Sequence, residues 1–320
     1  MRKIIATILV FSIALIGFLW WRDNEFRAQE TVTMRSVIDA TGNTVDIPMR
    51  PKRVVILNAS HLDLFCAAGG VQHIVGKPTS NALSASVQEA TAKAQEVGVI
   101  HSPNVEAILA LQPDLVIGIN VPFHHALQSV LAKANVPFLI KPLDTYEQVI
   151  ETLQFYGELN NQADMAAKAI DKIEKQYKLA IKQRSDFTAP KCLIVWGAAN
   201  SFSMATSESF AGDLLQRVGG NNIADQTDKQ KASGGFIPLS MEMVAKADPE
   251  IIFVITHSQN SNQDAFINQF VQDPVWQGVK AVQERRVYLL PSSLFAVNPG
   301  TRVGEALTIL ADHLYAGADK

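Results

Sequence analysis

The stretches NVEAILALQPDLVIGI (residues 104–119) and SMEMVAKADPEIIFVI (residues 240–255) repeat one pattern: an amphipathic run, a proline, an acidic residue and a continuous apolar run. Glu106 and Glu242 lie at equivalent positions, and the proline follows each at the same offset. Proline ends a helix, and a short uninterrupted apolar run is typical of a strand buried on both faces. The sequence therefore predicts a helix-to-strand unit that is used twice.

Short apolar runs alternate with helical patterns along most of the chain. The runs lie at 53–57, 114–119, 137–140, 191–196, 251–255 and 287–290. Strands that alternate with helices are typical of a parallel sheet covered by helices. The sequence therefore predicts an α/β fold.

The middle of the chain departs from this alternation. Residues 145–184 contain a single glycine, Gly157, and no proline, and they are rich in alanine, lysine, glutamine, glutamate and isoleucine. Because this composition favours helix, we expect one long helix or two helices with a break near 157–161.

These patterns divide the chain into an N-terminal α/β lobe (31–144), a bridging helix (145–187) and a C-terminal α/β lobe (188–320). Two similar lobes separated by a long helix form a cleft, and clefts bind ligands.

The first thirty residues form a separate segment. Arg2 and Lys3 precede an apolar run from Ile4 to Trp21, as in an export signal. The run approaches the roughly 20 residues that span a bilayer, and no clear cleavage site or lipid-accepting cysteine follows it. Residues 1–30 are therefore a poorly cleaved signal or, as we favour, a retained membrane anchor. Both interpretations place the body outside the cytoplasm, in the periplasm or on the outer face of the cytoplasmic membrane.

Charge and cysteine content exclude several classes of function. The formal net charge is -3, which gives no electrostatic basis for binding nucleic acid. Cys66 and Cys192 are far apart and form no CxxC pair, so a cysteine metal site is not expected. Each lies in an apolar stretch, and we expect two buried thiols.

Beyond the repeat, the chain after about residue 34 resembles the periplasmic-binding proteins for ferric siderophores, haem and cobalamin, and within that group the haem-binding lipoproteins of surface haem-uptake systems. The resemblance to the haem-binding lipoproteins rests on four stretches: GVIHSPNVEAILALQPDLV (98–116), ATSESFAGDLLQRVGGNNI (205–223), PEIIFVITHSQ (249–259) and RVYLLPSSLFAVNPGTRVGEAL (286–307). The resemblance implies two Rossmann-like lobes bridged by one rigid helix, no enzymatic activity, and haem as the transported ligand.

The resemblance also implies how the haem iron is held. In those proteins a methionine of the first lobe and a histidine of the second bind the iron across the cleft. The histidine falls on His257, and the methionine falls on His101, so this chain departs from the family at one axial position. The residues agree with this placement, because ligands of open α/β sheets bind beyond the carboxyl ends of strands and neutral imidazole is a good iron ligand. Two axial histidines predict a six-coordinate, low-spin haem.

Other histidines compete for the role in the first lobe. His124 and His125 follow the strand that ends at Ile119, so either one is an alternative iron ligand or a hydrogen-bond partner of a propionate. His61 begins a helix after the first strand and is a weaker candidate for the cleft wall. His73 and His313 are interpreted as structural.

A porphyrin also needs partners for its propionates and its faces. Arg302 and Lys77 are the candidate cations for the propionates. The candidate aromatic contacts are Phe123, Phe236 and Phe295.

The repeated glutamates have a further role by resemblance. In this superfamily one glutamate of each lobe docks into an arginine pocket of the permease dimer, whose ATPase drives import. Glu106 and Glu242 match these positions, and an acidic residue in the first helical turn also complements the helix dipole.

Three alternatives stay open. A ferric siderophore or a corrinoid could occupy the same fold, and a siderophore would need several arginines or aromatics in the cleft. A metal-dependent hydrolase is disfavoured because the chain has no HExxH and no GxSxG motif. A membrane-anchored sensor is disfavoured because no signalling domain is present.

Overall fold

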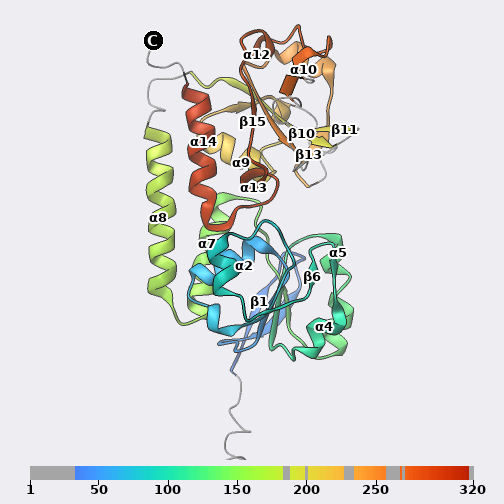
Figure 1. The fold of residues 1–320 in the computed structure, drawn as a ribbon, viewed down its shortest axis with the longest axis vertical. Coiled ribbons are helices and arrows are strands. Elements are labelled where there is room, and N and C mark those ends of the chain that lie inside the picture. The colour runs from blue at the N-terminus through green and yellow to red at the C-terminus, as the bar shows by residue number, and fades with distance from the viewer. Residues whose placement is uncertain are drawn as a thin grey trace, which may run out of the picture.

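Two α/β lobes lie one above the other, and helices α8 (Ala163–Ile181) and α14 (Val303–Tyr315) run beside the junction between them (Figure 1). The computed structural model describes residues 33–182, 188–198, 201–226, 234–256, 267–268 and 271–316. The predicted anchor at 1–30 lies outside these residues. Within the described ranges, no helix has both the length and the apolar character needed to cross a membrane.

The first lobe is built on a five-stranded parallel sheet with strand order β5-β4-β3-β8-β9. The strands are β3 (Val54–Ile56), β4 (Ile74–Lys77), β5 (Gln95–Glu96), β8 (Leu115–Gly118) and β9 (Phe138–Ile140). Every residue of β3, β8 and β9 is buried, as expected for strands covered by helices on both faces.

Helices and two small hairpins complete this lobe. The helices are α2 (Ala59–Ala67), α3 (Ala85–Ala90), α4 (Val105–Ala110), α5 (Pro122–His125) and α6 (Gln128–Lys133). The hairpins are β1–β2 (Met34–Ile38 and Thr44–Pro48) and β6–β7 (Gly98–Val99 and Ser102–Pro103).

The second lobe has a six-stranded mixed sheet with order β13-β11-β10-β14-β15, in which β12 also pairs with β10. Its strands are β10 (Lys191–Ala198), β11 (Ser201–Ala205), β12 (Asn221–Asn222), β13 (Phe236–Pro238), β14 (Ile251–Thr256) and β15 (Val287–Leu289). Strands β12 and β14 pair with β10 in parallel, and β15 pairs with β14 in parallel. Strand β11 is antiparallel to both of its neighbours, β10 and β13. Besides α14, the helices that the structure bounds in this lobe include α9 (Phe210–Arg217), α10 (Met241–Ala247), α12 (Lys280–Gln283) and α13 (Ser292–Phe295).

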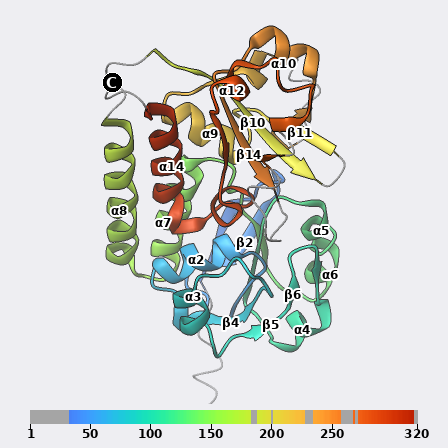
Figure 2. The same ribbon diagram turned by 45° about the horizontal axis from the view of Figure 1, so that its top comes forward.

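The segment between the lobes forms two helices, α7 (Tyr146–Leu159) and α8, and not one. The chain reverses at Asn160–Gln162, where Asn161 has a φ of 55°. Gly157 lets the two helices approach closely, because a Cβ there would lie 2.5 Å from that of Ala166. Helix α8 then packs against both α7 and α14 (Figure 2). The connection between the lobes is therefore a packed helical layer.

The repeat seen in the sequence has a structural role in both lobes. The carboxylate of Asp114 accepts hydrogen bonds from the backbone N–H groups of Lys52 and Arg53, at 2.7 and 2.9 Å. The Glu250 carboxylate accepts one from the N–H of Lys191 at 3.0 Å. Each acidic residue therefore pairs with the backbone at the start of the neighbouring parallel strand, β3 or β10, and helps to set the strand register.

One helix start differs from the expectation. Ser102 and Pro103 fit a helix start by type, but they form strand β7 of the small hairpin. Helix α4 begins at Val105, and the side chain of Asn104 accepts the Ala107 N–H as its N-cap. His101 is therefore in the two-residue turn of a hairpin and not directly before a helix.

His61 belongs to the core. It is fully buried, its Nε2 pairs with the carbonyl of Lys141 at 3.1 Å, and the Tyr156 hydroxyl pairs with its Nδ1 at 2.8 Å. Burial lowers the pKa of His61 to about 3. The cysteines are also structural: both are free thiols, Cys192 is buried and Cys66 is half-buried.

Asp213 fastens α7 to the second lobe. Its carboxylate accepts the backbone N–H of Tyr146 at 2.8 Å and the Nε–H of Arg217 at 2.9 Å. Arg217 also pairs with Glu147, and its guanidinium lies 5.1 Å from the centre of the Tyr146 ring. The Asp213 and Arg217 side chains are both largely buried, so their pairing within α9 is well shielded from water.

Replacing Asp213 with alanine should therefore destabilise the protein. The variant leaves the backbone N–H of Tyr146 without its acceptor and removes one of the two carboxylates that pair with Arg217, so we expect the free energy of unfolding to fall by about 2–4 kcal/mol in urea titrations. Asp171→Ala, which removes the exposed partner of Lys175, is the control and should change the free energy of unfolding by less than about 0.5 kcal/mol. Equal effects of the two variants would contradict the assignment.

The neutral state of His61 predicts a pH dependence of stability. Between pH 6.5 and about 3, the unfolded chain protonates this imidazole and the folded chain does not, so stability must fall as the pH falls. The contribution to the slope approaches about 1.4 kcal/mol per pH unit. We expect His61→Gln to be less stable at pH 7.5 but to show a shallower slope in urea titrations between pH 6 and 4. Identical slopes in the variant and the wild type would refute this.

Candidate functional site

A concave surface lies between the lobes. A cavity of about 830 Å³, open to solvent, is lined by both of them. The second lobe contributes four aromatic residues, Trp196, Phe210, Phe236 and Phe295. The first lobe contributes Asn58, Ser60, Ile100, Ile119, Asn120, Val121, Leu143 and Asp144. One wall is therefore aromatic and the opposite wall mixes apolar side chains with amide, hydroxyl and carboxylate groups.

A second cavity of about 810 Å³ extends this cleft on the side of the first lobe. It includes His101 and the loop 78–82. The two cavities share Asn58, Ile100 and Val297, so they are neighbouring parts of one cleft.

Among the histidines in the described ranges, His101 is the one that lines this cleft. Its side chain is exposed, and it lies at the tip of the β6–β7 hairpin on the wall of the second cavity. Gly98 permits the tight hairpin: its φ is +97°, and a Cβ there would lie 2.7 Å from the carbonyl oxygen of Ser102. The imidazole contacts the ring of Phe123 edge-on, with ring centres 6.3 Å apart.

His257 lies outside the described residues. The structure describes β14 as far as Thr256, and Ile255 pairs with Trp196 of β10. Because Trp196 lines the cleft, β14 ends at the sheet edge that faces the cleft. This is the edge at which parallel α/β sheets bind their ligands.

The two rival histidines differ sharply from His101. His124 is fully buried, and its Nδ1 accepts the Ile119 N–H at 3.0 Å. Burial lowers the pKa of His124, so its ring is neutral at pH 7. His125 is exposed and pairs with the amide oxygen of Asn120 at 2.8 Å. Neither His124 nor His125 is among the residues that line the two cleft cavities.

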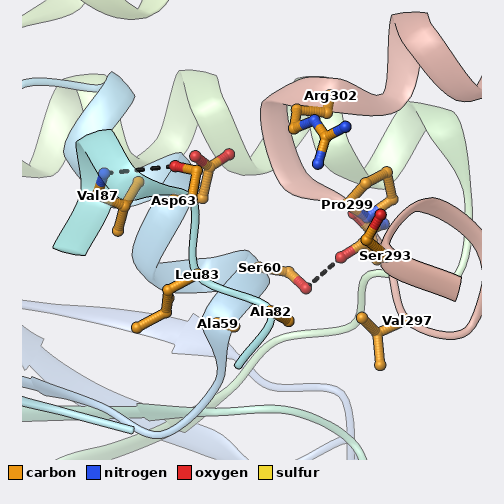
Figure 3. Close-up of a pocket in the computed structure, with 12 residues that line it drawn as sticks. Ala59, Ser60, Asp63, Ala82, Leu83, Val87, Ser293, Val297, Pro299 and Arg302 are labelled. Atoms are coloured by element: carbon orange, nitrogen blue, oxygen red, sulfur yellow. Dashed lines mark hydrogen bonds between the residues drawn. The ribbon is translucent and has the colours of Figure 1, made fainter. Parts of the chain in front are cut away.

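The two candidate cations lie in different places. Lys77 is only 8% exposed and is absent from the lining of both cavities, so the structure does not bring it to the cleft wall. Arg302 is paired with Glu305 at 2.7 Å and lines a smaller cavity between α2 and the segment 293–302 (Figure 3). This cavity shares three lining residues with the first cleft cavity, so Arg302 lies beside the cleft, and its contact with a propionate stays a prediction.

The smaller cavity marks a contact that holds the lobes together. The hydroxyl of Ser60 donates to the Asn298 carbonyl at 2.5 Å (Figure 3), and the Thr301 N–H donates to the carboxylate of Asp63 at 2.6 Å. Asn298 in turn donates from its side chain to the Leu143 carbonyl at 2.9 Å. Burial raises the pKa of Asp63, although the hydrogen bonds from Thr301 oppose this effect.

Two of the three predicted aromatic residues line the cleft. Phe236 and Phe295 line the cleft, whereas Phe123 is 52% exposed beside His101. Trp196 contacts Phe236 edge-on, with ring centres 5.3 Å apart. Neither Trp196 nor Phe210 was among the residues that the sequence analysis predicted for the cleft. Trp196 lies near the carboxyl end of a predicted strand, and that position is the signal that could have identified it.

The repeated glutamates lie at equivalent places of the two lobes. Glu106 and Glu242 are exposed, each in the first turn of its helix, α4 or α10. Their carboxylates are accessible to a partner from solvent.

Known proteins with this architecture can now be compared. The sequence matches the model of the family described as "Periplasmic binding protein" over residues 54–294. The "High-affinity heme uptake system protein IsdE" of Staphylococcus aureus (strain MRSA252) is 27% identical over 244 residues, which cover 76% of this chain and 80% of that protein.

Solved structures agree with the family match. The complex of S. aureus IsdE with heme superposes with a TM-score of 0.69 at 25% identity, covering 82% of this chain and 98% of that one. An ABC transporter substrate-binding protein of Listeria monocytogenes EGD-e gives a TM-score of 0.73 at 21% identity, covering 84% and 100%. The siderophore binding protein BauB, bound to acinetobactin and ferric iron, gives 0.68 at 22% identity, covering 87% and 99%.

The likeness to the Listeria protein and to BauB shows a shared fold, and the family match extends over most of the chain. The chain therefore belongs to the periplasmic binding protein family, whose members are extracytoplasmic substrate-binding components of ABC importers and not enzymes.

Proposed function

We propose that this protein binds haem as its transported ligand between the two lobes, with His101 and His257 as axial ligands of the iron, and delivers it to an ABC permease. The observation that supports this most directly is the position of His101: an exposed imidazole on the wall of a cleft whose opposite wall is aromatic. A porphyrin is a flat apolar ligand, and aromatic side chains bind such faces well. The relative named a heme uptake protein supports the same ligand class.

The second iron ligand would come from beyond β14. His257 directly follows the last described residue of that strand, Thr256, at the sheet edge that faces the cleft. One imidazole from each lobe would saturate the axial positions and leave no open site for oxygen chemistry, which suits a carrier.

The lining of the cleft disfavours the main alternative. Among the described residues that line the two cleft cavities, none is an arginine or a lysine. An anionic ferric siderophore would be left without a charged partner on these walls, whereas haem carries its two carboxylates at one edge of an otherwise apolar ring, so they can point to solvent while the ring faces the walls. The amide groups of Asn58 and Asn120 and the carboxylate of Asp144 suit an uncharged corrinoid better, which makes a corrinoid the second candidate.

The remaining parts follow the same proposal. The exposed Glu106 and Glu242 would dock into arginine pockets on the two subunits of the permease. Residues 1–30 would keep the body at the outer face of the cytoplasmic membrane, where the permease is.

Hemin titration tests the ligand. We expect the purified protein to give a sharpened Soret band with low-spin visible features, because two imidazoles coordinate the iron. His257→Ala and His101→Ala should each convert the complex to a high-spin or weakly bound form, and added imidazole should restore the low-spin spectrum. His125→Ala is the matched control and should leave it unchanged.

Two outcomes would contradict this proposal. An absence of any spectral change in the wild type would point to a corrinoid or a siderophore. Loss of the low-spin form in His125→Ala but not in His101→Ala would place the first-lobe ligand on α5.

Charge removal tests the docking. In proteoliposomes that contain the permease and its ATPase, Glu106→Ala and Glu242→Ala should each weaken docking by about tenfold or more, because each leaves a buried arginine without its partner. Haem spectra of both variants should match the wild type. Glu89→Ala, an exposed glutamate of α3, is the control. Unchanged haem delivery in both repeat variants would refute the docking role.

A further inference from the structure

The two parts of the cleft differ in charge. The aromatic part is the cavity lined by the aromatic wall, and the only charged side chain among its described lining residues is the carboxylate of Asp144. The loop part is the cavity lined by residues 78–82 and His101, and its described lining residues include no carboxylate. A ligand that spans both parts therefore meets a fixed negative charge at one end only.

The Asp144 carboxylate is available to act on a ligand. The residue is exposed, and its backbone N–H donates to the side chain of Gln148 at 2.6 Å. Within the described ranges, its carboxylate oxygens have no hydrogen bond or ion pair. Partial burial raises the pKa of Asp144, and no cation in the described part of the chain opposes this effect. The negative charge in the aromatic part is therefore not compensated by the protein.

Haem is a ligand whose charge lies at one edge. Its two propionates carry negative charge, whereas the opposite edge of the ring carries uncharged vinyl and methyl groups. Two negative charges repel each other far more strongly in a site that is partly shielded from water than in bulk water. A propionate beside Asp144 is therefore disfavoured, while the vinyl edge suits the aromatic side chains of this part of the cleft.

The loop part offers hydrogen-bond donors to a carboxylate. It is lined by the side-chain amide of Asn81 and by the hydroxyl of Ser80. The Ser80 oxygen accepts the Ala82 N–H at 3.1 Å, so the hydroxyl proton is left for a ligand. Hydrogen bonds from neutral groups to a charged acceptor are stronger than those between two neutral groups. The loop part thus suits the propionate edge better than the aromatic part does.

We propose that Asp144 determines which way round the haem lies: its carboxylate excludes the propionate edge from the aromatic part of the cleft and leaves that edge to the loop part. This inference rests on the haem proposal and adds the in-plane orientation of the ring. Arg302 does not distinguish the two ends, because the smaller cavity that it lines shares residues with both parts. Asp144 does distinguish them, because it lines the aromatic part alone.

Proton NMR of the low-spin ferric hemin complex locates the propionates. In the wild type we expect nuclear Overhauser contacts from the propionate methylene protons to the methyl group of Ala82 and none to the ring of Phe236. In Asp144→Asn a second set of haem signals with contacts to Phe236 should rise about threefold or more, because the repulsion is removed. Asp144→Lys should make this set the major one, because attraction replaces repulsion.

A ligand control and a protein control separate charge from shape. Hemin dimethyl ester has the same ring but no charged edge, so its orientation should be the same in the wild type and in both Asp144 variants. Asp164→Asn removes an exposed aspartate in the first turn of α8, outside the cleft lining, and should leave the orientation of hemin unchanged. Thermal unfolding without hemin should be alike in Asp144→Asn and the wild type, because no hydrogen bond to the carboxylate is lost.

The outcomes distinguish this inference from the haem proposal. A wild-type protein that forms no low-spin hemin complex would overturn both. A low-spin wild type whose propionates contact Phe236, or whose orientation is unchanged in Asp144→Asn and Asp144→Lys, would overturn the role of Asp144 alone. A reorientation of hemin dimethyl ester as large as that of hemin would also overturn it, because the effect would then arise from shape and not from charge.

Discussion

The cleft depends on hydrogen bonds between side chains of α2 and backbone groups of the second lobe. The Asn298 carbonyl and the Thr301 N–H are paired with Ser60 and Asp63, and the Asn298 side chain reaches back to Leu143. A buried backbone group that loses its partner costs free energy, so these contacts resist separation of the lobes. Gly300 is required here, because its φ is +62° and a Cβ would lie 2.4 Å from the Asp63 carboxylate.

The helical layer strengthens this constraint from the side. Helix α8 packs on both α7 and α14, while Asp213 ties the start of α7 to α9. The lobes are thus connected by packed apolar surface, by hydrogen bonds to backbone groups and by the ion pair between Arg217 and Glu147. Such a connection favours a cleft of nearly constant width over the hinge closure used by many two-domain binding proteins. Ligand selection then depends on the walls of the cleft rather than on closure around the ligand.

Burial separates histidines whose roles the local sequence does not distinguish. His61 is enclosed by Tyr156 and the Lys141 carbonyl, and His124 has one nitrogen bonded to the sheet, so both are neutral structural groups. His101 stands at a hairpin tip and remains accessible. Because metal binding needs a free nitrogen lone pair on an accessible ring, only the last of these three suits an iron ligand without rearrangement.

Local sequence determined the parts of this protein that depend on periodicity. The apolar runs identified the buried strands, the Ser209 and Ser240 caps marked the starts of α9 and α10, and the repeated helix–proline–acid–strand unit indicated two similar lobes and the family. These features follow from backbone hydrogen bonding and side-chain alternation over a few residues, which a sequence displays directly.

Tertiary structure alone decided what depends on contacts between distant residues. The burial of Lys77 and His124 arises from packing against segments far away in the chain. The position of Arg302, in a smaller cavity beside the cleft, arises in the same way. The aromatic wall is of the same kind, because Trp196, Phe236 and Phe295 come from separate elements and meet only when the second sheet and its helices are assembled. No local pattern encodes which face of the folded lobe such a side chain will line.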